Sequence, residues 1–146
     1  MMRILVFLFC VVAPHCHGAT YYVDPVSGSD TNSGASTNLA WRSIPGTLQT
    51  NGSNYLSSAW GSFNSGASKV PGGTTVLVKS GSLFAATNFG PVNITRDYWA
   101  ESSTNIVIAT DTGWGDGTPA KFDGSGVAVE IAMILIQIDG VTVSNL

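Results

Sequence analysis

The chain has 146 residues, a formal net charge of −3 and a charged fraction of 10%, and this length suits one domain of ordinary size. The small negative charge argues against a surface that follows nucleic-acid phosphates. Glycine is abundant, with 17 residues, and serine, threonine and asparagine are also frequent, which excludes a coiled coil or a helical bundle. A hydrophobic fraction of 44% can build a core, so intrinsic disorder is excluded as well.

Residues 1–19 have the layout of a secretory signal peptide. Arg3 supplies the positive charge, residues 4–13 form an apolar run, and the small residues Gly18 and Ala19 follow, as in a cleavable export signal. The apolar run is too short to cross a bilayer, so we expect no membrane span in the mature chain. The sequence therefore predicts a secreted, extracellular or periplasmic protein, with a buried first strand or a membrane anchor as the alternative.

Removal of this segment limits the chemistry of the mature chain. Both cysteines and both histidines lie inside it, namely Cys10, His15, Cys16 and His17. Disulfides, a Ser-His-Asp triad and an ordinary zinc site are therefore excluded from residues 20–146. Aspartate, glutamate, lysine, arginine and tyrosine remain as groups for acid–base work.

The rest of the chain alternates short β-branched or aromatic runs with turn-forming residues, which is typical of strands. The predicted strands cover residues 20–23, 74–79, 92–95, 106–109, 120–124, 134–138 and 141–143. Many short strands with turns between them predict an all-β sandwich, barrel or solenoid. Residues 47–63 are compatible with one short helix or with irregular coil.

Three features favour the solenoid. The strands are very short for a sandwich. Their centres at Leu77, Val107 and Leu135 recur at similar intervals, as expected for a parallel β-helix in which each coil stacks on the last. Gly140 stands alone between two strands, and a lone glycine suits a corner between sheets better than a hairpin turn.

Several stretches carry a resemblance to a known family. They are the Tyr-Tyr-Val-Asp-Pro motif at 21–25, Gly-Ser-Asp at 28–30, Trp-Arg-Ser-Ile at 41–44, the Pro-Gly-Gly-Thr-Thr-Val run within 71–81, and the glycine-cornered segment 136–145. Together they resemble the beginning of secreted right-handed parallel β-helix proteins of the pectate-lyase-like kind. One departure is Gly73, which stands where those proteins commonly have aspartate.

The resemblance implies an N-terminal cap over residues 20–73 and the first coils of the β-helix over residues 74–146. It also implies further coils beyond residue 146, so we expect the N-terminal part of a longer protein. That family includes polysaccharide lyases, glycoside hydrolases, epimerases and adhesins. The predicted partner is therefore a polysaccharide or cell-surface glycan, and the predicted activity a calcium-assisted lyase acting on a uronate-containing glycan. The alternatives are a non-catalytic adhesive solenoid and a small, complete sugar-binding sandwich.

Candidate metal ligands lie close together near the start of the mature chain. Residues 30–34 partly match the start of a calcium loop, with Asp30 and Asn32 as oxygen ligands and Asp24 as a further carboxylate. Because a third side-chain ligand and the closing glutamate are missing, an Asx-rich turn is the favoured interpretation and Ca²⁺ the alternative.

A second acidic group consists of Asp111, Asp116 and Asp123 in and beside a glycine-rich loop. Paired carboxylates serve glycosidases and clustered oxygens hold calcium, but loops favour aspartate without any such function. Solvated turn residues are therefore the favoured interpretation.

The resemblance also implies a basic residue that abstracts a proton from an acidic sugar. Lys79, Arg96 and Lys121 are the possible bases, but no spacing selects one of them, so no catalytic residue is predicted.

Aromatic side chains can stack on sugar rings or pack in a core. Trp99 and Trp114 are flanked by polar loops and are expected to be exposed and to contact substrate. Trp41 is expected to be buried.

Overall fold

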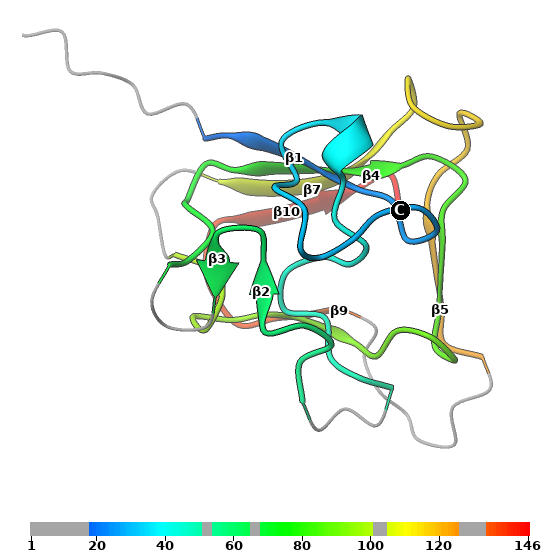
Figure 1. Ribbon diagram of the computed structural model, residues 1–146. Coiled ribbons are helices and arrows are strands. Elements are labelled where there is room, and N and C mark those ends of the chain that lie inside the picture. Colours follow the sequence, from blue (N-terminus) through cyan, green and yellow to red (C-terminus); the bar gives the residue numbers. More distant parts are fainter. Residues whose placement is uncertain (1–17, 51–53, 65–67, 101–104, 126–133) are drawn as a thin grey trace, which may run out of the picture.

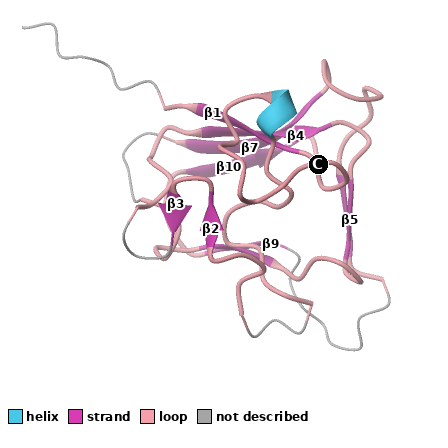
Figure 2. Cartoon of the chain, in the orientation of Figure 1, coloured by secondary structure: helices cyan, strands magenta, loops and turns pink. Residues whose placement is uncertain are grey.

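The computed structural model describes residues 18–50, 54–64, 68–100, 105–125 and 134–146, so the predicted signal peptide lies almost wholly outside the described residues. These residues form strands and turns, with a single 3-10 turn η1 (Thr37–Leu39) (Figure 2). Among them, no helix has the length and hydropathy that crossing a bilayer requires. The all-β prediction is confirmed.

Four strands form the largest sheet, and all of its pairs are parallel. They are β1 (Thr20–Val23), β4 (Thr75–Lys79), β7 (Ile106–Asp111) and β10 (Val141–Ser144), adjacent in that order (Figure 1). The chain leaves the sheet after each strand and returns in the same direction. Since sandwiches of the immunoglobulin kind are built from antiparallel sheets, this pairing contradicts the sandwich alternative.

Two smaller parallel sheets lie on other sides of the same interior (Figure 1). They pair β5 (Leu83–Ala85) with β8 (Lys121–Asp123), and β6 (Val92–Ile94) with β9 (Ile134–Ile136). The chain thus visits three sheets in turn, first as β4, β5 and β6, then as β7, β8 and β9. A short antiparallel hairpin of β2 (Ala59–Trp60) and β3 (Phe63–Asn64) precedes them.

Glycines form two of the corners between sheets. Gly81 and Gly140 have φ values of 72° and 71°, a left-handed conformation that costs little without a Cβ. Gly140 lies between β9 and β10, which belong to different sheets, so the predicted corner is confirmed.

Alternate side chains of each strand point into the shared interior. Val76 and Val78 of β4 and Ile106 and Ile108 of β7 are all buried. Phe84 and Phe122, which are paired in register, stack at 4.7 Å with an interplanar angle of 6°. Such stacking joins successive layers through apolar contact as well as through backbone hydrogen bonds.

Buried aromatic residues fill the end of the interior beneath the N-terminal segment. Those with the largest buried side chains are Trp41, Trp60, Tyr98 and Trp99. The burial expected for Trp41 is confirmed: its ring stacks on Tyr21 at 4.7 Å.

The described residues of 47–63 contain no helix: they form irregular coil followed by β2 and the start of β3, so the coil alternative is the closer one. The prediction for Leu135 is wrong. Leu135 belongs to β9 and pairs with Asn93, so it is not the next layer after Val107, which pairs instead with Thr142. Both Leu135 and Thr142 follow strand-like patterns, and pattern alone does not say which sheet a strand joins.

The two edges of the four-stranded sheet differ. Gly34 and Trp41 cover the β1 edge through backbone hydrogen bonds: the Tyr22 amide donates to Gly34, and the Trp41 amide donates to Tyr22. Within the described part of the chain, β10 pairs with β7 alone. In the described part of the chain β9 likewise pairs with β6 alone, and its Leu135 and Ile136 are 39% and 44% exposed.

Unpaired strand edges and exposed apolar side chains on an edge strand favour association with other strands. We therefore expect the purified chain to self-associate with rising concentration in sedimentation velocity, and Ile136→Lys to shift it toward the monomer. Leu83→Lys is the matched control, because Leu83 is 50% exposed but lies on β5. A wild-type chain that stays monomeric at every concentration would contradict this expectation.

Candidate functional site

A polar cavity of about 300 Å³ lies where β1, β4 and the loop after β7 meet. Its lining combines charged, hydroxyl, amide and aromatic groups, namely Asp24, Ser27, Gly28, Thr37, Asn38, Ala40, Lys79 and Trp114. We refer to it as the Lys79 cavity. Its volume is at the lower end of the range for small-ligand pockets, roughly 300–1,000 Å³.

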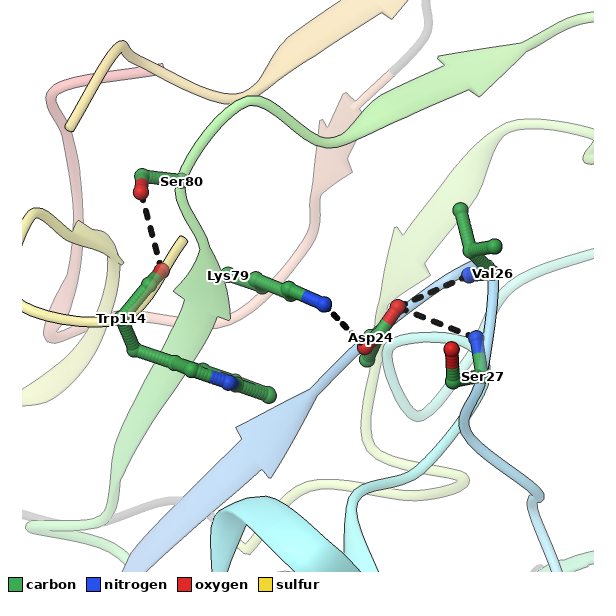
Figure 3. Close-up of polar contacts among 6 residues, drawn as sticks. All are labelled: Asp24, Val26, Ser27, Lys79, Ser80 and Trp114. Carbon is green, nitrogen blue, oxygen red and sulfur yellow. Dashed lines mark hydrogen bonds and ion pairs between the residues drawn. The ribbon is translucent and has the colours of Figure 1, made fainter. Parts of the chain in front are cut away.

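Parallel register brings the charged residues of the cavity together. Val23 of β1 is paired with Val78 of β4, so Asp24 and Lys79 follow matched positions on neighbouring strands. The Lys79 Nζ donates to Asp24 Oδ2 at 2.9 Å (Figure 3). The Asp24 side chain is 6% exposed, whereas that of Lys79 is 33% exposed. The lysine head therefore reaches the cavity while its carboxylate partner is almost covered.

Three donors hold the Asp24 carboxylate. Besides Lys79, the backbone amides of Val26 and Ser27 donate to Oδ1 at 2.9 and 3.1 Å (Figure 3). Burial by itself raises the pKa of Asp24, but these hydrogen bonds and the charge of Lys79 outweigh it, so the pKa lies below its ordinary value. Asp24 is thus a fixed anion at neutral pH.

Trp114 forms the aromatic wall of the cavity. Its ring centroid lies 5.7 Å from the Lys79 Nζ, and it meets Tyr22 edge to face at 5.7 Å. Trp114 is half-buried, so part of the indole remains available to a ligand. An indole beside polar donors and acceptors is an arrangement that recognises a ligand with both apolar and polar faces.

Ser80 holds the loop that carries Trp114. Its backbone amide and its Oγ both donate to the Trp114 carbonyl at 2.9 Å, and the Gly117 amide donates to the Oγ at 2.8 Å (the side-chain contact is drawn in Figure 3). Ser80 is 4% exposed. Because Ser80 directly follows Lys79, one short segment positions both the cation and the aromatic wall.

The predicted calcium ligands are engaged by donors of the protein itself. Asp30 accepts the backbone amides of Arg42 and Ser43 and the Ser43 hydroxyl at 2.8–2.9 Å. Burial raises the pKa of Asp30 despite these three hydrogen bonds. Asn32 donates its side-chain amide to the Ala40 carbonyl at 3.0 Å. These contacts are those of a turn that fastens the N-terminal segment.

Calcium binding remains a prediction. Among the described residues, no group of three or more histidine, cysteine, aspartate or glutamate side chains lies at metal-binding distances. Of the proposed ligands, Asp24 lines the Lys79 cavity, whereas Asp30 and Asn32 do not.

The second acidic group lies at or beside turns: Asp111 and Asp123 end β7 and β8, and Asp116 lies in the loop between these strands. Asp111, Asp116 and Asp123 each accept a backbone amide two residues later, from Gly113, Thr118 and Ser125. The hydrogen bonds from Thr118 and Ser125 lower the pKa of Asp116 and Asp123. This geometry agrees with the interpretation as turn residues.

Of the possible bases, Lys79 lines the cavity, and Arg96 and Lys121 are not among the lining residues.

The expected exposure of Trp99 is wrong. Trp99 is fully buried and its Nε1 donates to the Pro45 carbonyl at 3.0 Å, so the indole packs in the core. Trp114 is the tryptophan that borders the cavity.

Sequence reasoning missed Ser27, Thr37 and Asn38 as lining residues, and it did not pair Asp24 with Lys79. One signal for the pair was present: the runs Thr-Tyr-Tyr-Val-Asp and Thr-Val-Leu-Val-Lys at 20–24 and 75–79 align residue by residue, as they do in the sheet. The three smaller polar residues lie in turns that carry no such pattern.

No protein-family model matches this chain, and the searches found no similar chain among curated proteins or solved structures.

Proposed function

We propose that this chain is the N-terminal part of a secreted right-handed parallel β-helix protein and that it binds polysaccharide in the Lys79 cavity. The three parallel sheets, visited in turn and joined by glycine corners, support the β-helix. The covered β1 edge and the open β10 edge support a cap at the N-terminal end, with further coils stacking on β10.

The observation that carries the binding proposal is the composition of the cavity. A sugar residue has apolar faces of C–H groups and a rim of hydroxyl groups. Trp114 offers an aromatic surface to such a face, and Lys79 and Asn38 offer hydrogen-bonding groups to the rim. The small volume suits one unit of a longer chain that extends beyond the cavity.

The hydrogen bond between Lys79 and Asp24 favours a binding function over elimination chemistry. Its ammonium group donates to Asp24, so it serves as a hydrogen-bond donor and not as a free base. A proton-abstracting group would need an available lone pair directed at the sugar. The proposal is therefore a glycan-binding β-helix, which corresponds to a surface or adhesive module.

A polysaccharide array followed by affinity electrophoresis tests the proposal. We expect Trp114→Ala to weaken binding of any retained glycan by about tenfold or more, since loss of an aromatic anchor costs at least about 1–2 kcal/mol. Leu83→Ala is the control, because Leu83 is exposed but does not line the cavity. Equal retention of the Trp114→Ala variant and the wild type would contradict the proposal for this site.

A further inference from the structure

The charges around the Lys79 cavity bear on whether it favours a neutral or an acidic glycan. Among the described residues, the lining contains one cation, Lys79, and one anion, Asp24, which are joined by a 2.9 Å ion pair. These two charges cancel. An anionic ligand would have to compete with Asp24 for the ammonium group.

A second carboxylate lies on the other side of Lys79. In the four-stranded sheet Lys79 is paired in register with Asp111 of β7, and both residues are at outward-facing positions of their strands. Lys79 is thus flanked along the row by Asp24 and Asp111. Two carboxylates around one ammonium give this surface a net negative charge, which opposes the approach of a polyanion.

The remaining polar groups of the cavity are uncharged. Ser27, Thr37 and Asn38 supply hydroxyl and amide groups, which both donate and accept hydrogen bonds. Lys79 adds a further donor, so the lining matches hydroxyl groups, each of which is a donor and an acceptor. Trp114 adds a surface for the apolar face of a ring.

We propose, building on glycan binding in this cavity, that the preferred ligand is a neutral sugar unit and that Asp24 excludes uronate by neutralising Lys79. This assigns Asp24 a role in specificity: its carboxylate occupies the one cation that would otherwise bind a sugar carboxylate. Lys79, held in place by Asp24, then donates to sugar hydroxyl groups.

Pairs of polysaccharides that share a backbone and differ in charge test this role. Suitable probes are homogalacturonan with its fully methyl-esterified form and glucuronoxylan with unsubstituted xylan, on an array that also holds glucans, mannans and alginate. Binding is measured by affinity electrophoresis at low and at physiological salt, about 0.01 and 0.15 M. We expect the wild-type chain to retain neutral glycans, with less than about a twofold change in affinity between these salts.

Asp24→Asn keeps the size of the side chain and removes its charge. We expect this variant to gain at least about tenfold affinity for the acidic member of a pair at low salt, and a smaller gain at physiological salt. Lys79→Gln, the matched variant, should gain none, and circular dichroism checks that both variants fold. If Asp24→Asn does not fold, the relative affinity of the wild-type chain for the neutral and the acidic member of each pair still tests the specificity proposal.

The possible outcomes separate the two proposals. Tighter, salt-sensitive binding of uronate-containing glycans by the wild-type chain would overturn the specificity proposal and leave glycan binding intact. An absence of binding to every polysaccharide on the array would overturn glycan binding in this cavity and the specificity proposal with it.

Discussion

Replacement of Trp99 by alanine should lower the free energy of unfolding by about 3–5 kcal/mol. The indole is fully buried, and its Nε1 donates to the Pro45 carbonyl. The substitution would leave a large cavity and a buried carbonyl without its donor, and both effects are destabilising. Urea denaturation followed by circular dichroism measures the change.

Trp114→Ala is the matched control for this experiment. The same residue type is removed, but Trp114 is half-buried at the cavity rim, so a loss of about 1 kcal/mol or less is expected. The loss of stability for Trp99→Phe should fall between those of the two alanine variants, because phenylalanine keeps an aromatic ring and loses the hydrogen bond. Similar losses for Trp99→Ala and Trp114→Ala would contradict the burial described for Trp99.

Replacement of Asp24 by alanine should cost about 2 kcal/mol of stability near neutral pH, as expected for a charged acceptor with several donors. The amides of Val26 and Ser27 and the ammonium of Lys79 would lose their common acceptor. Part of the loss is offset because Lys79 is partly exposed and can be hydrated. Asp139→Ala, at an exposed aspartate in the turn before β10, should change stability by about 0.5 kcal/mol or less.

The same carboxylate predicts a dependence of stability on pH. The pKa of Asp24 in the fold lies below its ordinary value of 3.8, so the unfolded chain binds this proton more readily than the folded one. The stabilisation is fully present above pH 3.8 and is lost as the pH falls through the lower, folded value. We expect the difference in stability between wild type and Asp24→Ala to shrink below pH 3.8. A difference that stays constant through this range would contradict the role given to the Asp24 charge.

The sequence was most informative where alternation and corner residues coincide. Thr75–Lys79 and Ile106–Asp111 have regular alternation of buried and outward residues, and Gly140 marks a change of sheet. These local signals predicted strands and a parallel arrangement. They did not predict which strands are neighbours, because Leu135 and Thr142 both fit a layer above Val107 and only packing selects Thr142.

Candidate site residues were harder to predict for a physical reason. Trp99 and Trp114 both lie beside polar loops in sequence, yet Trp99 is fully buried and bonded to Pro45 of the N-terminal segment, whereas Trp114 touches that segment through Tyr22 and stays half-buried. Burial by a segment that is distant in sequence cannot be predicted from the residues next to a tryptophan. Asp24 was a candidate calcium ligand because of its turn, whereas its partner Lys79 comes from the neighbouring strand and becomes visible only after the two strands are aligned.

The loop that carries Trp114 can change in length and sequence without a change in the strands that flank it. In the first layer, β4 passes to β5 through residues 80–82 alone, whereas in the next layer β7 passes to β8 through residues 112–120. The longer connection leaves the strand register unchanged, because β5 and β8 still pair residue by residue. The proposed ligand preference could therefore be exchanged by grafting a different loop between Asp111 and Lys121, with the paired strands left as they are.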